Sequence, residues 1–233
     1  MLLTVRIQRG QLFGLAAILS IAWCTMAQAS SISWSNAAGS TADFSWSDGA
    51  NDTGLASTSP FVIANVFTFT TSNFKAIALN GSNSTAGDII HVTLIPAAGK
   101  RISSISASFL GDATVAGTGS AGVSATLDAV NHGTSDHVSN VLGVPDITTQ
   151  GAFNDNLLLN IPANFGTIDL TLDASVHSTA ANGSSALIEM KLLQLGVGTA
   201  MAAPVVPLPA AVLMSPGAAL IAAYASRRMK RQK

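Results

Sequence analysis

Cysteine is almost absent from the sequence, and charged side chains are scarce. Only 10% of the 233 residues are charged, and the one cysteine, Cys24, lies in an apolar run near the N-terminus. A mature chain that starts after this run has no thiol, which excludes disulfides, thiolate catalysis and cysteine-ligated metals. Bulky Trp23, directly before Cys24, also disfavours lipoprotein attachment. Stability must therefore come mainly from packing.

Positive charge is missing from the middle of the chain. Residues 30–203 contain only four of the basic residues but all 12 acidic ones, and Glu189 is the only glutamate. The other basic residues lie at the two ends. Because no basic patch is available to neutralise phosphates, we expect no binding of nucleic acid.

The N-terminus has the features of a secretory signal. Two arginines precede an apolar run, and Ala27 and Ala29 are small residues at the two positions that a signal peptidase reads. We therefore predict that residues 1–29 are a signal peptide and that cleavage leaves Ser30 as the first residue. An uncleaved anchor is the alternative, which the short apolar run disfavours.

Apolar residues of the central part alternate with Ser, Thr and Asn. In 166–178, Ile168, Leu170, Leu172, Ala174 and Val176 share one face, and polar residues occupy the other. This period of two is typical of a strand with one buried face. The same pattern predicts further strands at 31–37, 41–47, 61–71, 74–81, 88–97, 101–111, 121–130, 137–144 and 156–162.

The strand pattern indicates an all-β fold. About ten or eleven short strands, separated by turn sequences and without a strongly amphipathic helix, favour an antiparallel β-sandwich or jelly roll. We place this domain at 30–197. The apolar spacing of 184–198 partly fits a helix, but its position after a β-rich body favours a final long strand. Residues 198–204 then form a short linker.

The last segment, 205–233, combines an apolar stretch with a basic end. About 21 apolar or small residues are enough for a transmembrane helix. Five basic residues follow, which the positive-inside rule keeps in the cytoplasm. They are Arg227, Arg228, Lys230, Arg231 and Lys233. With the signal peptide at the other end, the body lies outside the inner membrane.

A proline motif opens this tail. The motif reads Val206, Pro207, Leu208, Pro209 and Ala210. Followed by an apolar span and a basic terminus, it resembles the VPLPA variant of the PEP-CTERM sorting signal. The resemblance implies export in a Gram-negative bacterium, recognition by an exosortase-like enzyme that cuts near the motif, and association with the cell surface, biofilm or extracellular polysaccharide. A plain C-terminal membrane anchor is the alternative interpretation.

Ligands for a metal are few. Asp48, Asn51 and Asp52 gather oxygen atoms in one glycine-containing loop, as calcium prefers, but without the closing glutamate of an EF-hand. A capped turn is the preferred interpretation there, and calcium is the alternative. His132 and His137, near Asp128 and Asp136, match no zinc spacing, and we expect a solvated loop.

Catalytic motifs are also lacking. The serines stand in no Gly-x-Ser-x-Gly elbow, and His91 and His177 have no evident partner. Asp169 and Asp173 share a strand face but lie about 13 Å apart, too far for the carboxylate pair of a glycosidase. We therefore expect no enzymatic activity and no cofactor, and we expect Glu189 to pair with neighbouring Lys191.

The aromatic residues of the first hairpin admit two interpretations. Trp34, Phe44 and Trp46 alternate with serines, which favours a buried face over sugar stacking at the surface.

Together these patterns predict an exported structural or adhesive protein of the cell surface or matrix. Its expected partners are signal peptidase, an exosortase-like enzyme, the inner membrane and extracellular polysaccharide. A carbohydrate- or calcium-binding module is the second hypothesis, and a secreted hydrolase the third.

Overall fold

The computed structural model describes residues 31–203, which form two antiparallel sheets. Sheet I contains β1 (Ile32–Ser33), β2 (Gly39–Ser40), β3 (Phe44–Asn51), β7 (Asn83–Pro96), β9 (Gly119–Asn131), β10 (His137–Val141) and β12 (Ile168–Ala180). Sheet II contains β4 (Phe61–Ile63), β5 (Val66–Thr70), β6 (Lys75–Leu79), β8 (Lys100–Ala116), β11 (Gly151–Asn160) and β13 (Ser185–Met201). The described residues contain no helix, so the all-β prediction is confirmed for this part of the chain.

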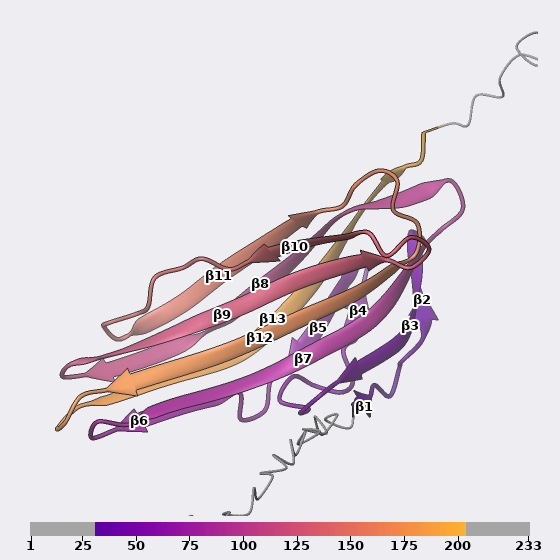
Figure 1. The fold of residues 1–233 in the computed structure, drawn as a ribbon. Coiled ribbons are helices and arrows are strands. Elements are labelled where there is room, and N and C mark those ends of the chain that lie inside the picture. Colours follow the sequence, from indigo (N-terminus) through magenta and orange to yellow (C-terminus); the bar gives the residue numbers. More distant parts are fainter. Residues whose placement is uncertain (1–30, 204–233) are drawn as a thin grey trace, which may run out of the picture.

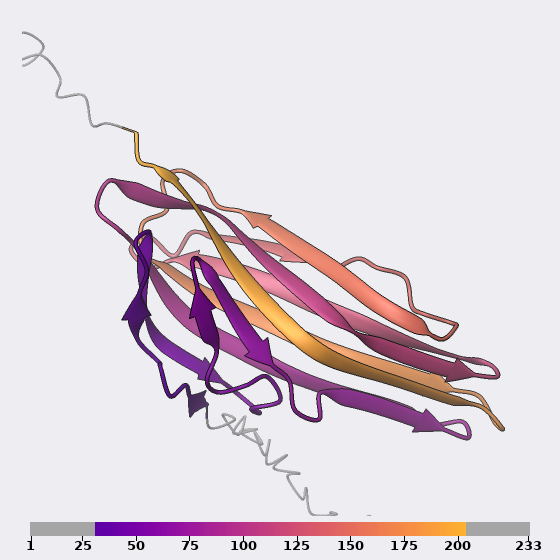
Figure 2. The same cartoon turned by 180° about the vertical axis from the view of Figure 1, so that it is seen from behind.

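The two sheets form a sandwich of long strands (Figure 1). The order in sheet I is β1-β3-β7-β12-β9-β10, with β2 beside β3. In sheet II the order is β11-β8-β13-β5-β4, and β6 pairs with the first part of β13. From β7 to β9, and again from β10 to β13, each successive strand changes sheet. Figure 2 shows sheet II from behind, with β13 at its centre.

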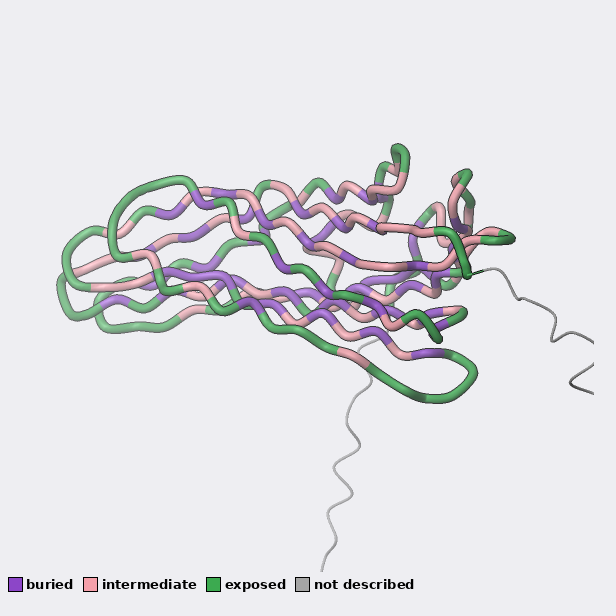
Figure 3. Tube along the Cα trace, turned by 90° about the horizontal axis from the view of Figure 1, so that it is seen from above, coloured by how far each residue is buried: buried purple, intermediate pink, exposed green. Residues whose placement is uncertain are grey.

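Buried residues alternate with less buried ones along the long strands (Figure 3). On β12, Ile168, Leu170, Leu172, Ala174 and Val176 are all buried, as their spacing predicts. The residues between them face outward. Period-two patterning therefore identifies the core face of this central strand.

Aromatic rings fill one end of the space between the sheets. Trp34, Phe44 and Trp46 are buried, which confirms the predicted buried face. The Trp46 ring of sheet I meets the Phe67 ring of sheet II edge-on, with centroids 5.2 Å apart. Trp34 and Phe69 are 5.3 Å apart in a similar geometry. These contacts join the sheets through large apolar surfaces.

Thirteen strands are present in the described residues, more than the ten or eleven expected. One cause is that 61–71, predicted as one strand, is the hairpin β4–β5. Its chain reverses at Ala64, whose φ of 51° is in the left-handed region. The other cause is β2, which has only two residues, too few for a periodic pattern.

The final strand is longer than expected. β13 continues to Met201, because Thr199, Ala200 and Met201 pair with the start of β8. The first four residues of the linker predicted at 198–204 are therefore part of the sheet. The preference for a strand over a helix in this segment is confirmed.

The two termini lie outside the described residues. This applies to the predicted signal peptide and to the tail from residue 205 onward, including the sorting motif and the basic end. Among residues 31–203, no helix is long and apolar enough to cross a membrane.

Candidate binding face

The outward side of sheet I has many polar side chains along its long central strands. We call the outward side chains of its three central strands, β7, β12 and β9, the polar face. Its polar members are Asn83, Thr85, His91, Thr93, Ser120, Ser124, Thr126, Asp128, Asp169, Thr171, Asp173, Ser175, His177 and Thr179. They are brought together because β12 pairs with β7 on one side and β9 on the other.

Cross-strand register places hydroxyl groups opposite one another on this face. Ser124 and Ser175 are register partners, and their hydroxyl oxygens are 2.8 Å apart. Ser120 and Thr179 repeat the arrangement at 3.0 Å. Such pairs hold the hydroxyls in fixed positions while leaving them at the water interface. The surface can therefore offer ordered donors and acceptors to a polar ligand.

Histidines and carboxylates form pairs on the same side of the molecule. His132 Nδ1 is 2.7 Å from Asp169 Oδ2, and His177 Nε2 is 3.0 Å from Asp146 Oδ1. His91 Nε2 lies 3.6 Å from Asp52 Oδ1. The sequence predicted no partner for His91 or His177, since each carboxylate is distant along the chain.

Hydrogen bonds on this side of the molecule shift the pKa values of His132, Asp169 and Asp146. The hydrogen bond with Asp169, and then its charge, raises the pKa of His132. Burial alone would raise the pKa of Asp169, but hydrogen bonds with His132 and Thr93 outweigh it and lower the value. The hydrogen bond from Ser120 is the main cause that lowers the pKa of Asp146. These carboxylates are therefore held in their ionised form.

One Ser–Asp–His group resembles a catalytic triad only in composition. Ser120 Oγ donates to Asp146 Oδ2 at 2.7 Å, and His177 contacts the other oxygen of the same carboxylate. In a catalytic triad the imidazole stands between the hydroxyl and the carboxylate, so that it can remove the hydroxyl proton. Here the carboxylate occupies the middle position, and the serine bonds to it and not to the imidazole.

A second group has the residue order of a catalytic triad but lacks the hydrogen bond between imidazole and carboxylate and an oxyanion hole. His91 lies between Thr171, 3.3 Å from Nδ1, and Asp52, 3.6 Å from Nε2. The latter distance is too long for a hydrogen bond. Thr171 stands in β12, whose backbone N–H groups are engaged with strands on both sides. They cannot form the oxyanion hole that acyl transfer requires.

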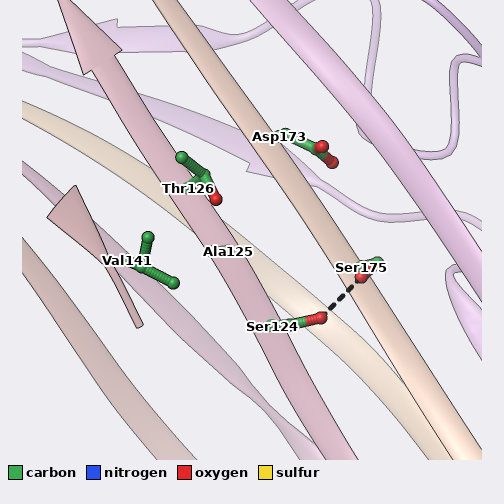
Figure 4. Close-up of a pocket in the computed structure, with 6 residues that line it drawn as sticks. All are labelled: Ser124, Ala125, Thr126, Val141, Asp173 and Ser175. Carbon is green, nitrogen blue, oxygen red and sulfur yellow. Dashed lines mark hydrogen bonds between the residues drawn. The ribbon is translucent and has the colours of Figure 1, made fainter. Parts of the chain in front are cut away.

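A small hollow lies where β9, β10 and β12 meet on the polar face (Figure 4). Ser124, Thr126, Val141, Asp173 and Ser175 contribute side chains to its lining, and a hydrogen bond joins the two serines. Its volume is about 90 Å³. Sites that enclose a small molecule usually have roughly 300–1,000 Å³. The hollow therefore suits a group projecting from a larger ligand.

The structure separates the three residues suggested for calcium. Asn51 is fully buried: its amide oxygen accepts from the Trp34 indole, and its Nδ2 donates to Ala56 O at 3.0 Å. Asp48 is exposed and accepts from Ser47 Oγ at 2.7 Å, while Asp52 faces His91. Within residues 31–203, no group of three or more His, Cys, Asp or Glu side chains could hold a metal ion. Calcium binding here stays a prediction.

One further expectation about side chains differs from the structure. Lys191 pairs with Asp112 on the neighbouring strand β8 and not with Glu189. His132 and Asp136 lie in an exposed segment after β9, as expected, where His132 pairs with Asp169 and Asp136 accepts from Thr134 Oγ1 at 2.7 Å. The local sequence does not reveal the partners of Lys191 and His132, which are distant along the chain.

Asp88 is a structural residue that sequence analysis missed. It is 2% exposed and accepts hydrogen bonds from Asn51 Nδ2 at 3.1 Å and from the backbone N–H groups of Thr53 and Ala56 at 2.9 Å. The carboxylate thereby fixes the loop after β3. The apolar residues that follow it at every second position, Ile90, Val92 and Leu94, are the signal that placed it on the inner face.

No protein-family model matches the chain, and no curated protein matches it. Among solved structures it is similar to TmCBM61 in complex with β-1,4-galactotriose, with 14% identity, a TM-score of 0.24, and coverage of 57% of this chain and 70% of that one.

Two other solved structures have comparable similarity. For the CBM22-1–GH10 modules of Clostridium thermocellum endo-1,4-β-D-xylanase 10B with xylohexaose, the identity is 9% and the TM-score 0.26, over 55% of this chain and 26% of that one. For the enzymatically active domain of bacteriophage CBA120 tailspike protein 4, the identity is 8% and the TM-score 0.23, over 54% of this chain and 20% of that one. TM-scores this low establish neither a shared fold nor a shared ligand.

Proposed function

We propose that this chain is an exported, non-catalytic structural or adhesive protein that contacts extracellular polysaccharide at the cell surface or in the matrix. The observation that carries the proposal is the polar face. Three adjacent long strands present fixed hydroxyl, imidazole and carboxylate groups at the surface of sheet I. A polyhydroxylated polymer can form many weak hydrogen bonds to such a surface, directly or through water.

The side-chain geometry also supports a role without catalysis. The Ser120–Asp146–His177 group places its carboxylate between the other two side chains, and Thr171 has no backbone donors beside it for an oxyanion. In neither group is an imidazole within hydrogen-bonding distance of both a hydroxyl and a carboxylate, as a triad requires. A secreted hydrolase is therefore a weaker hypothesis than a binding protein.

Polymer retention tests the role of the polar face. The exported protein is mixed with the extracellular polysaccharide of the cells that produce it, and the bound fraction is measured by sedimentation. Replacing Ser124, Thr126 and Ser175 by Ala, Val and Ala removes three hydroxyls, and we expect retention to fall several-fold. Thr114→Val, an exposed hydroxyl removed from sheet II, is the matched control. Equal retention by both variants would reject this face as the contact surface.

Delivery by the predicted tail is tested separately by mass spectrometry of the mature protein. We expect the chain to begin at Ser30 and to end within Pro207–Ala210. A mature chain that still ends at Lys233 would show that the tail is a plain anchor or is not processed, whatever the body binds.

A further inference from the structure

The outward side of sheet II has a different chemistry from the polar face. One row of register partners crosses five strands: Asn156 on β11, Ser108 on β8, Gln194 on β13, Thr68 on β5 and Phe61 on β4. We call it the amide row. Its members face away from the core, because the residues on both sides of each interior member, such as Leu193 and Leu195, are buried. The strands that contribute it lie side by side in Figure 2.

The exposed end of this row is an aromatic ring. Phe61 is 65% exposed, whereas the other phenylalanines of the described strands, such as Phe67 and Phe69, are buried. Its register partner Thr68 places the ring on the same side as Gln194. An exposed aromatic ring offers a flat apolar surface against which the C–H face of a pyranose can pack.

Polar atoms of the row are available for a ligand. Ser108 Oγ donates to Asn156 Oδ1 at 2.6 Å. This bond uses the amide oxygen of Asn156 and leaves its Nδ2 group without an acceptor among the described residues. Gln194 Nε2 is 3.5 Å from Thr68 Oγ1, a weak contact that leaves its carbonyl oxygen without a partner among the described residues. The row therefore presents a donor and an acceptor at positions fixed by the sheet.

The lack of charge in the amide row disfavours a strongly ionic ligand. No member of the amide row is charged, and the neighbouring positions Leu110 and Leu192 form an apolar pair beside it. Charged side chains stand further along the sheet, where Lys191 pairs with Asp112. Uncharged amides next to apolar side chains match an uncharged ligand that itself has both hydroxyl and C–H surfaces.

The spacing of the row matches an extended polymer. Neighbouring strands lie roughly 4.8 Å apart, so five strands span about 19 Å. This interstrand step is similar to the advance per unit of an extended β-linked pyranose chain, so that successive sugars can meet successive strands. From these observations we propose that the amide row binds an uncharged, extended β-linked polysaccharide, with Phe61 stacking on a terminal sugar and Gln194 and Asn156 bonding to its hydroxyls.

The site is separate from the polar face, since the two lie on opposite outer sides of the sandwich. A protein with both surfaces can bridge two polymer chains, which extends the proposed adhesive function without depending on the polar face itself.

Native gel electrophoresis of the exported protein through immobilised polymers tests the proposal. The probes are β-1,4-galactan, xylan and hydroxyethylcellulose, with α-linked dextran as a control. We expect retardation by at least one β-linked polymer and a weakening of the affinity by about tenfold in F61A, the effect of losing a principal contact residue. Gln194→Leu, which removes the amide but keeps the bulk, should weaken it several-fold. Ile32→Ala, an exposed aliphatic residue on β1 of sheet I that belongs to neither surface, should leave it unchanged.

Fluorescence of F61W gives an independent readout. Trp34 and Trp46 are buried in the core, so an indole at position 61 is the reporter that a ligand at the row can reach. We expect its emission to shift on addition of the polymer that retards the protein.

Retardation that survives in both F61A and Gln194→Leu would overturn the amide-row site, and so would a complete lack of retardation by the β-linked probes. Either result leaves the polar face and its retention test unaffected, so the two proposals fail separately.

Discussion

Asp88 shows at the scale of one residue how a buried charge is accommodated. Its carboxylate has no cationic partner among residues 31–203 and accepts instead from one amide group and two backbone N–H groups. Hydrogen bonds to a charged acceptor are stronger than neutral ones, and they offset part of the cost of burial. The residue thereby ties the loop after β3 to the centre of sheet I.

Replacing Asp88 by Ala should destabilise the protein strongly. The change leaves the N–H groups of Thr53 and Ala56 and the amide of Asn51 without their acceptor, and we expect a loss of about 3 kcal/mol in the free energy of unfolding. Urea denaturation measures it. Asp173→Ala, on the exposed face, is the control and should change stability by less than about 0.5 kcal/mol. Similar midpoints for both variants would show that the network around Asp88 contributes little.

His132 provides a pH-dependent test of the polar face. Because Asp169 raises the pKa of His132, the stabilisation from this pair is fully present below the ordinary value of 6.5 and is lost as pH rises through the higher value of the folded state. Asp169→Asn should therefore return the pKa of His132 toward 6.5, as followed by NMR titration of its ring protons. Asp173→Asn, which does not contact His132, should not. An unchanged titration in Asp169→Asn would mean that the pair does not form in solution.

At the scale of elements, a bulge in β13 explains an ambiguous sequence pattern. Ala186, Ile188 and Met190 point into the core, and after an extra residue the inward series continues with Leu193, Leu195 and Val197. The register shift lies between Met190 and Leu192. The resulting spacing of three residues imitates a helical pattern within a strand, because a bulge changes the phase of the alternation.

The bulge also creates a position that only glycine can occupy without strain on its neighbours. Gly111 pairs with Met190, and a Cβ at Gly111 would overlap the carbonyl oxygen of Glu189 and the ring of Phe153. We expect Gly111→Ala to lower the free energy of unfolding by about 1–3 kcal/mol through overpacking. Thermal unfolding of the variant provides the measurement.

Gly151→Ala is the matched control for this substitution. Gly151 begins β11, and an added Cβ there meets no atom within 4 Å. Because glycine is entropically unfavourable in a strand, this variant should be neutral or slightly stabilising. The bulge argument would be wrong if both glycine variants behaved alike.

At the scale of the whole molecule, the two sheets differ in charge but share one core. All four basic residues between 31 and 203 lie on strands of sheet II, and all four histidines lie on or beside strands of sheet I. Core residues from both sheets nevertheless pack against one another, as Trp46 and Phe67 do. The two outer surfaces can therefore have different ligands while the sandwich remains one cooperative unit.

We expect this shared core to give a single unfolding transition. Urea curves from far-UV circular dichroism, which reports both sheets, should coincide with those from the fluorescence of buried Trp34 and Trp46. Phe67→Ala should lower the free energy of unfolding from both curves by the same amount, about 3–5 kcal/mol. F61A should leave both curves in place. Separated curves would instead show that the sheets unfold independently.

Much of the fold was predictable because strand alternation is a local property. The inward residues of β12 and the buried aromatics of the first hairpin follow directly from their spacing. The β4–β5 hairpin was not predictable in the same way, since the apolar pattern runs through Ala64 without a glycine or proline to mark the turn. The end of β13 depended on a partner strand almost 100 residues earlier in the chain.

The sequence by itself determined the all-β class, the core face of the long strands, the acidic balance of the body and the resemblance of its tail to a sorting signal. Each of these depends on residues close together in the chain. Only the tertiary structure decided which side chains meet. His132 and Asp169 are 37 residues apart, His177 and Asp146 are 31 apart, and the amide row draws one residue from each of five strands. Strand order and register create these surfaces, and both are set by packing of the two sheets as a whole.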